Sequence, residues 1–119
     1  MLADFTETVS SEQYDSRYLF YGTTEEGLKR LKENGLKPST KCVDHVCLYA
    51  DYGQAKRTAG IKSMKNRSQP IVLYIDRDAT SEMSFERENC DHTRYKHAGT
   101  IISDKLKKVS WALDFLLTL

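Results

Sequence analysis

The segment RYLFYG (residues 17–22), followed directly by TTEEGLKRLKENG (residues 23–35), carries the clearest structural signals in the sequence. The aromatic residues and leucine of the first part are typical of a β-strand. Thr23 and Glu26 have the spacing of a capping box, which begins a helix, and the final glycine is a common helix terminator. The segment therefore predicts a strand that leads without a loop into a short helix over residues 24–34.

Strands and helices are also predicted after this helix. The apolar run at residues 71–75 predicts a strand covered on both faces, because it does not alternate between apolar and polar residues. Weaker signals predict strands at residues 45–49, 83–87 and 100–102, a helix at 52–65, and a last helix at 104–118 capped by Ser103 or Asp104. The pattern predicts one α+β domain over residues 1–119, in which residues 1–16 form an acidic N-terminal arm.

The composition excludes several classes of protein. The chain has 18 Lys and Arg residues against 17 Asp and Glu residues, so its formal net charge is +1. It therefore has no overall positive field for nucleic acid. No apolar run approaches the roughly 18 residues of a membrane span, and the N-terminus has no signal-peptide pattern. Three cysteines do not indicate a disulfide framework. We expect a cytoplasmic protein that makes no membrane contact.

Tyr21-Gly22-Thr23 lies where the first strand meets the first helix. A glycine here allows a ligand to approach the backbone closely, and the N–H groups at a helix N-terminus attract an anion or a carboxamide. The ring of Tyr21 is able to stack on a flat ligand. By itself the motif is more typical of a tight strand-to-helix turn at Gly22 than of a ligand site, and the ligand site is the alternative.

The order of motifs resembles a known family. Tyr21-Gly22-Thr23, Gly35-Leu36-Lys37-Pro38 and His45-Val46-Cys47-Leu48 resemble the NAD-binding lobe of the RNA 2'-phosphotransferases, which belong to the ADP-ribosyltransferase superfamily. Later likenesses lie at residues 70–76, 85–89 and 100–104, so that the resemblance covers roughly residues 17–109. It implies an ADP-ribosyltransferase-like fold, with two small antiparallel or mixed half-sheets around an NAD cleft and two to three helices. Only 16 residues precede the first strand, so we expect the family's N-terminal RNA-binding lobe to be absent.

The resemblance also implies roles for individual residues. Gly22 would hold the carboxamide of NAD, and Tyr49 and Tyr52 would sandwich its nicotinamide ring. Arg87 or Arg57 would meet the pyrophosphate. The implied catalytic residues are Tyr21, Arg87, Glu86 and Glu88. The implied cofactor-binding residues are Tyr21, Gly22, Thr23, Lys41, His45, Tyr49, Tyr52, Arg57 and Asn89. Tyr21 stands where the family motif has a histidine.

We therefore expect transfer of ADP-ribose from NAD to a macromolecular acceptor, either protein or nucleic acid. The first alternative is a catalytically silent module that binds a nucleotide or a protein on the same fold. Residues 51–70 carry five basic side chains against one acidic side chain, which suits contact with phosphates. The C-terminal helix is expected to pack on the sheet, or on a partner or second copy if Trp111 and Phe115 are exposed.

The second alternative is a zinc-stabilised interaction domain. Zinc is held by four nitrogen or sulfur ligands in most structural sites. The candidate ligands are Cys42, His45, Cys47, Cys90, His92 and His97. Their spacing matches no standard zinc motif, and ADP-ribosyl transfer requires no metal, so we expect none to be bound.

Overall fold

The structure is a computed structural model that describes residues 17–38, 45–88 and 94–119. Several sequence predictions therefore lie outside the described residues. These are the acidic arm at residues 1–16, the candidate NAD contacts Lys41 and Asn89, and the candidate zinc ligands Cys42, Cys90 and His92.

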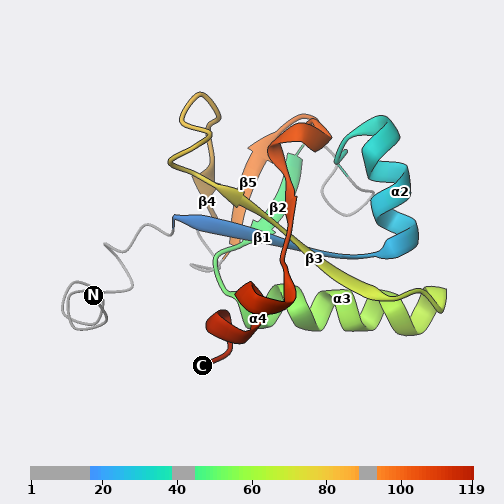
Figure 1. The fold of residues 1–119 in the computed structure, drawn as a ribbon. Helices are drawn as coiled ribbons and strands as arrows, with labels where there is room; N and C mark the ends of the chain where they lie inside the picture. Colours follow the sequence, from blue (N-terminus) through green and yellow to red (C-terminus); the bar gives the residue numbers. More distant parts are fainter. Residues whose placement is uncertain (1–16, 39–44, 89–93) are drawn as a thin grey trace.

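The described residues form a six-stranded antiparallel sheet and three α-helices (Figure 1). The strands have the order β4-β5-β2-β1-β3-β6. Their bounds are Tyr18–Thr24 for β1, His45–Tyr49 for β2, Pro70–Asp76 for β3, Glu86–Arg87 for β4, Arg94–Ala98 for β5 and Lys107–Lys108 for β6. The helices are α2 (Glu25–Asn34), α3 (Tyr52–Asn66) and α4 (Trp111–Leu117), with a short 3₁₀ helix at Ser103–Lys105. The predicted α+β class is confirmed.

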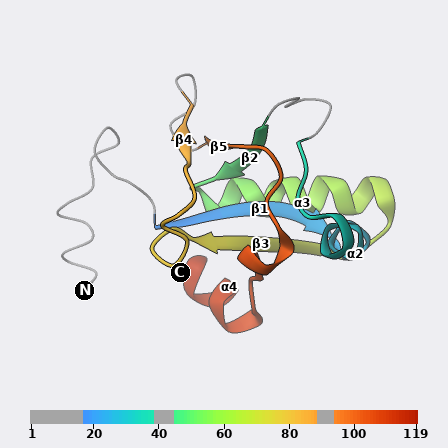
Figure 2. The same cartoon turned by 90° about the horizontal axis from the view of Figure 1, so that it is seen from above.

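The two half-sheets implied by the resemblance are joined into one sheet. β1 pairs with β3 through seven residue pairs, whereas β1 and β2 pair only between Phe20 and Tyr49. The narrow junction separates β4, β5 and β2 from β1, β3 and β6, and Figure 2 shows the two groups diverging. The sheet is therefore continuous but consists of two parts with little backbone pairing between them.

Two apolar clusters cover opposite faces of the sheet. The larger cluster contains Leu19, Leu31, Leu36, Val46, Leu48, Ile71, Leu73, Ile75, Tyr95 and Ile101. The smaller cluster contains Phe20, Tyr52, Ala55, Ala59 and Val72. Successive residues of β3 enter different clusters because side chains alternate along a strand. The prediction that residues 71–75 are covered on both faces is confirmed.

β1 and α3 approach each other closely at Gly22. A Cβ atom on Gly22 would lie 2.2 Å from the carbonyl oxygen of Ala55 and 2.7 Å from the backbone nitrogen of Ala59. Both atoms belong to the backbone of α3, so the clash cannot be relieved by rotation of a side chain. The sequence interpretation that Gly22 leaves room for a ligand is therefore corrected, because α3 occupies that space.

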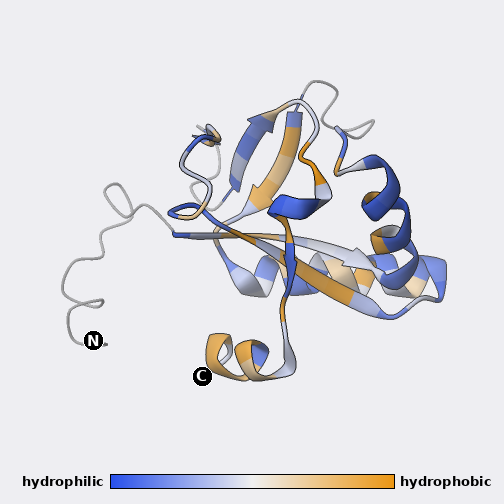
Figure 3. Cartoon of the chain, turned by 45° about the horizontal axis from the view of Figure 1, so that its top comes forward, coloured by the Kyte–Doolittle hydropathy of each residue, from blue (hydrophilic) through white to orange (hydrophobic). Residues whose placement is uncertain are grey.

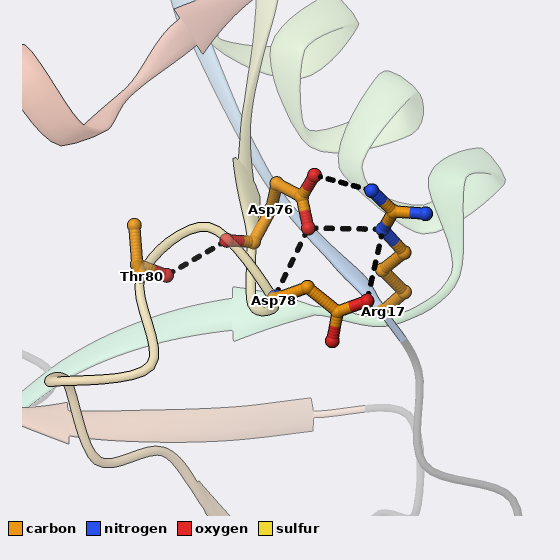
Figure 4. Close-up of polar contacts among 4 residues, drawn as sticks. All are labelled: Arg17, Asp76, Asp78 and Thr80. Carbon is orange, nitrogen blue, oxygen red and sulfur yellow. Dashed lines mark hydrogen bonds and ion pairs between the residues drawn. The ribbon is translucent and has the colours of Figure 1, made fainter.

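An ion pair joins the start of β1 to the end of β3. The guanidinium of Arg17 donates to both carboxylate oxygens of Asp76, at 3.0 and 2.9 Å (Figure 4). The backbone N–H of Asp78 also donates to Asp76, and the Thr80 hydroxyl donates to the Asp76 carbonyl. The hydrogen bond from Arg17 lowers the pKa of Asp76. These contacts fix the turn that follows β3.

The first helix differs from its prediction in the capping residue. The helix bounds agree with the expected range, and Gly35 ends the helix with a positive φ of 76°. The cap, however, is Thr24, whose hydroxyl accepts a hydrogen bond from the backbone N–H of Gly27 at 3.1 Å. Thr23 belongs to β1, which continues one residue further than the capping-box pattern indicates.

The structure of the C-terminal region differs more strongly from its sequence prediction. The predicted helix at residues 104–118 covers only Trp111–Leu117, and its cap is Ser110 rather than Ser103 or Asp104. Lys107 and Lys108 instead pair with β3, and the Val109 N–H donates to the Val72 carbonyl. The strand expected at residues 100–102 is a single bridge between Leu36 and Ile101.

Trp111 and Phe115 are 84% and 57% exposed on α4, and Figure 3 shows that much of this C-terminal helix has hydrophobic colours. The sequence predicts that α4 contacts a partner or a second copy if these two side chains are exposed. They are exposed, and the contact itself stays a prediction.

Among the helices of the described residues, none combines the length and apolar character needed to cross a membrane.

We predict opposite effects from adding one methyl group at two glycines. Gly22→Ala forces β1 away from the α3 backbone and should lower the free energy of unfolding by about 1–3 kcal/mol. Gly60 lies within α3, and a Cβ atom there meets nothing within 4 Å. Gly60→Ala should therefore raise the free energy of unfolding by about 0.5–1 kcal/mol. Urea denaturation of both variants tests this, and equal stability of Gly22→Ala and the wild type would contradict the packing argument.

Candidate functional site

A cavity in the described part of the chain lies between β1, α2 and the end of α3, and we call it the cationic pocket. Its volume is about 400 Å³, which is within the range of ligand pockets. Tyr21 and Thr23 of the sequence motif line it. Arg30, Lys37 and Lys62 also line it, whereas no carboxylate is among its described lining residues. The pocket therefore suits an anionic ligand.

Lys62 is held in a defined position in this pocket. Its Nζ donates to the carbonyl oxygen of Gly22 at 2.7 Å and to the Tyr21 hydroxyl at 3.2 Å. The same Nζ lies 4.3 Å from the centre of the Tyr21 ring, a distance typical of a cation–π contact. Because these contacts fix the ammonium group before a ligand binds, less side-chain entropy is lost on binding.

The N-terminus of α2 does not offer the N–H groups that the sequence analysis expected to meet an anion. The Glu25 N–H donates to the Gln69 carbonyl at 2.9 Å, and the Glu26 N–H donates to the Ser68 hydroxyl at 3.1 Å. The Gly27 N–H donates to Thr24. This expectation is corrected, because the segment between α3 and β3 occupies the first two donors and the cap occupies the third. The charge of the pocket comes from side chains.

The predicted tyrosine pair lies on the other face of the sheet. Tyr52 belongs to the smaller cluster, and Tyr49 packs against that cluster. The Tyr52 hydroxyl donates to the Asp114 carboxylate of α4, and Lys56 pairs with the same carboxylate at 3.0 Å. Burial raises the pKa of Tyr52, and the bond to Asp114 raises it further. Tyr52 therefore connects α3 to α4 through this hydrogen bond, and it does not line the cationic pocket.

Arg87 shares a face of the sheet with Tyr21 but not its pocket. Its Nε and one terminal nitrogen donate to the Tyr95 hydroxyl at 3.1 and 3.0 Å. Tyr95 pairs with Leu48 on β2, and both residues belong to the larger cluster, against which Tyr21 also packs. Three strand spacings of about 4.8 Å place Arg87 roughly 14 Å from β1. Tyr21 and Arg87 therefore lie on the same face of the sheet but are too far apart to contact each other.

The two candidate glutamates lie elsewhere. Glu86 is exposed and precedes Arg87 on β4, so its side chain points to the opposite face. Glu88 accepts a hydrogen bond from Arg94 at 2.7 Å, which raises the pKa of that arginine. The Nε2 atom of His45 lies 3.7 Å from the other Glu88 oxygen.

The structure therefore brings together only part of the predicted site. Tyr21 and Thr23 line one pocket, and the backbone carbonyl of Gly22 contacts a pocket residue. Arg57 is exposed on α3 and does not line this pocket. The sequence motifs do not mark Arg30, Lys37 and Lys62 as pocket residues. The basic stretch at residues 51–70 was a usable signal for Lys62, and the Gly-Leu-Lys-Pro motif was one for Lys37.

Comparison with models of known protein families gives no match for this sequence, and comparison with curated proteins gives none.

Acid should weaken the contact between α3 and α4. The Tyr52 hydrogen bond, followed by the bond from Lys56, lowers the pKa of Asp114. A carboxylate with a lowered folded-state pKa contributes stability above its unfolded value of about 3.9, and this contribution is lost as the pH falls through the folded value. Below about pH 4 the wild type should therefore lose stability through Asp114.

The variant Tyr52→Phe tests this contact. It removes the hydroxyl and should cost about 1 kcal/mol at pH 7, with a smaller difference from the wild type at pH 3. Asp76 and Glu82 also have lowered pKa values, but both remain in the variant, so they do not affect the difference. Melting temperatures across this pH range provide the measurement, with Tyr74→Phe as the matched control. A pH-independent difference for Tyr52→Phe would count against the proposed contact.

Proposed function

We propose that the protein binds NAD in the cationic pocket and transfers ADP-ribose from it to a macromolecular acceptor. The observation that carries this proposal is that Tyr21 and Thr23, two motif residues of the ADP-ribosyltransferase-like pattern, line one cavity of about 400 Å³ together with three cationic side chains. Arg30, Lys37 and Lys62 give that cavity the charge that a pyrophosphate requires.

The transfer breaks the bond between C1' of the ribose and nicotinamide, and it forms a bond between C1' and a nucleophilic oxygen or nitrogen of the acceptor. Nicotinamide leaves with the bonding electrons, and the acceptor loses a proton. The transition state carries positive charge on the ribose, as in glycoside cleavage. Binding of the pyrophosphate by fixed cations would hold the ribose in place, because orientation lowers the barrier of such a displacement.

Tyr21 and Arg87 are the candidate catalytic residues that share a face of the sheet, and we assign the reaction to this face. Tyr21 is partly buried and packs against the larger cluster, beside the pocket cation Lys62. Its hydroxyl is suited to a polar contact with the ribose. Arg87 is suited to stabilise a negatively charged group of the donor or acceptor that extends along this face.

A catalytically silent binding module is the second candidate, and a specific observation favours it. Arg87 and Glu88 are engaged by Tyr95 and Arg94, while Glu86 points to the opposite face from Arg87. Buried Leu48 and Tyr95 lie between Arg87 and β1. A pocket whose candidate catalytic groups are separated in this way would bind a nucleotide without catalysing its reaction.

Nucleotide binding is tested by replacing a single pocket cation. Lys62→Gln should weaken NAD binding roughly tenfold to a hundredfold, because one charge-assisted hydrogen bond is lost. Lys65→Gln is the matched control, since Lys65 is exposed on the same helix and does not line the pocket. Isothermal titration gives the affinities, and amide NMR shifts at Tyr21 and Thr23 locate the ligand. If millimolar NAD moves neither amide, the proposed nucleotide site is wrong.

Turnover is tested separately with labelled NAD and cell lysate. We expect label to appear in protein or nucleic acid, to disappear with Arg87→Ala and to persist with Lys65→Gln. Titration of Arg87→Ala with NAD should still show binding, because Arg87 does not line the pocket. Binding without labelling or NAD consumption by the wild type would exclude transfer and support the silent module.

A further inference from the structure

His45, Cys47 and Glu88 form a compact group of metal-type ligands outside the cationic pocket. One imidazole nitrogen, the thiol sulfur and one carboxylate oxygen all lie within 4.8 Å of one another. The two β2 residues are separated by one position, so their side chains lie on the same face of the strand. Glu88 directly follows β4, and its backbone N–H donates to the Arg94 carbonyl at 2.9 Å. The group is therefore built on the sheet framework.

Against the expectation from the sequence that no metal is bound, we propose that these three residues bind a zinc ion. Zinc accepts nitrogen, sulfur and oxygen ligands, and sites with three protein ligands leave a fourth position for water or another group. Bond lengths of about 2.0–2.3 Å and tetrahedral angles place the donor atoms about 3.3–3.8 Å apart. The distance of 3.7 Å between His45 Nε2 and Glu88 Oε1 already fits this range. Small side-chain rotations of the half-buried residues would bring the Cys47 sulfur within range.

The surroundings of the group meet two further requirements of a metal site. The Nε of Arg94 donates to Glu88 Oε2 and a terminal nitrogen of the guanidinium forms an ion pair with the same oxygen, each at 2.7 Å, which leaves Oε1 on the side of His45. Hydrogen bonds of this kind orient a ligating carboxylate. His45 also lines a cavity of about 270 Å³, so that this ligand borders a space from which an ion could approach.

The donor types select zinc over the alkaline-earth ions. A thiolate and an imidazole suit zinc, whereas magnesium and calcium prefer oxygen ligands throughout. With Cys47 as thiolate and Glu88 as carboxylate, the ligands carry two negative charges, which a divalent ion neutralises. The positive charge of Arg94 remains paired with Glu88. This site is independent of NAD binding, because none of its three ligands lines the cationic pocket.

Metal titration of the full chain tests the proposal. Protein stripped with a chelator should bind one zinc ion per chain in competition with a chromophoric chelator, and excess magnesium should not displace it. Cys47→Ala and His45→Ala should each weaken zinc binding at least tenfold, the lower limit seen even when residues that only support a ligand are removed. Melting curves measured without metal show whether each variant is folded, and added zinc should raise the melting temperature of the wild type but not of Cys47→Ala.

A double variant, Cys42→Ser with Cys90→Ser, is the control because it leaves Cys47 as the single thiol of the chain. It should keep wild-type zinc affinity and, with cobalt as probe, the absorption of a thiolate-to-metal charge transfer. Cys47→Ala should lose that absorption. Zinc binding that survives Cys47→Ala, or that disappears in the double variant, would overturn the proposal. A chain that binds no zinc at micromolar concentration would also overturn it.

Discussion

The contact between Gly22 and the backbone of α3 determines how the rest of the structure is arranged. Ala55 and Ala59 are the helix residues at this contact, and both are fully buried. Small residues on both sides bring β1 and α3 closer than larger side chains would permit. Lys62 follows Ala59 by about one turn of the helix, which places its ammonium group on the Gly22 carbonyl. The position of Lys62 in the cationic pocket therefore depends on the short distance between β1 and α3, which the absence of a side chain at Gly22 permits.

The fold was predictable where local signals were strong. Residues 17–76 contain the strands and helices that propensity, capping and apolar runs indicate, and α2, α3 and β3 have nearly the expected bounds. β5 was not predicted, because Tyr95 is its only buried residue and its other side chains are polar except for the small Ala98. The C-terminal region was misread because Leu106 and Val109 follow a helical spacing, yet they pack against the two apolar clusters on either side of the sheet. Edge strands such as β6 form through distant pairing partners, which local periodicity does not reveal.

The candidate site was predictable in its motif but not in its geometry. Tyr21 and Thr23 were selected from the sequence and line one pocket. Tyr49 and Tyr52 lie where a strand passes into a helix, and the period of the pattern changes there, so the sequence did not show which face they would occupy. The approach of His45 to Glu88 joins residues 43 positions apart through the pairing of β2 with β5 and of β5 with β4. Such a meeting depends on strand register, which a single sequence leaves open.

The single residue pair between β1 and β2 divides the sheet into two parts that are joined at a narrow seam. Along β1 and β3, seven residue pairs resist bending, whereas at the seam the resistance comes mainly from side chains packed across it, including Leu19 and Leu48. Regions with few backbone hydrogen bonds deform at lower cost than regions with many. The cationic pocket borders β1 on one side of this seam, whereas Arg87 lies on β4 on the other side. The relative position of the two therefore depends on side-chain packing across a junction that has one backbone residue pair.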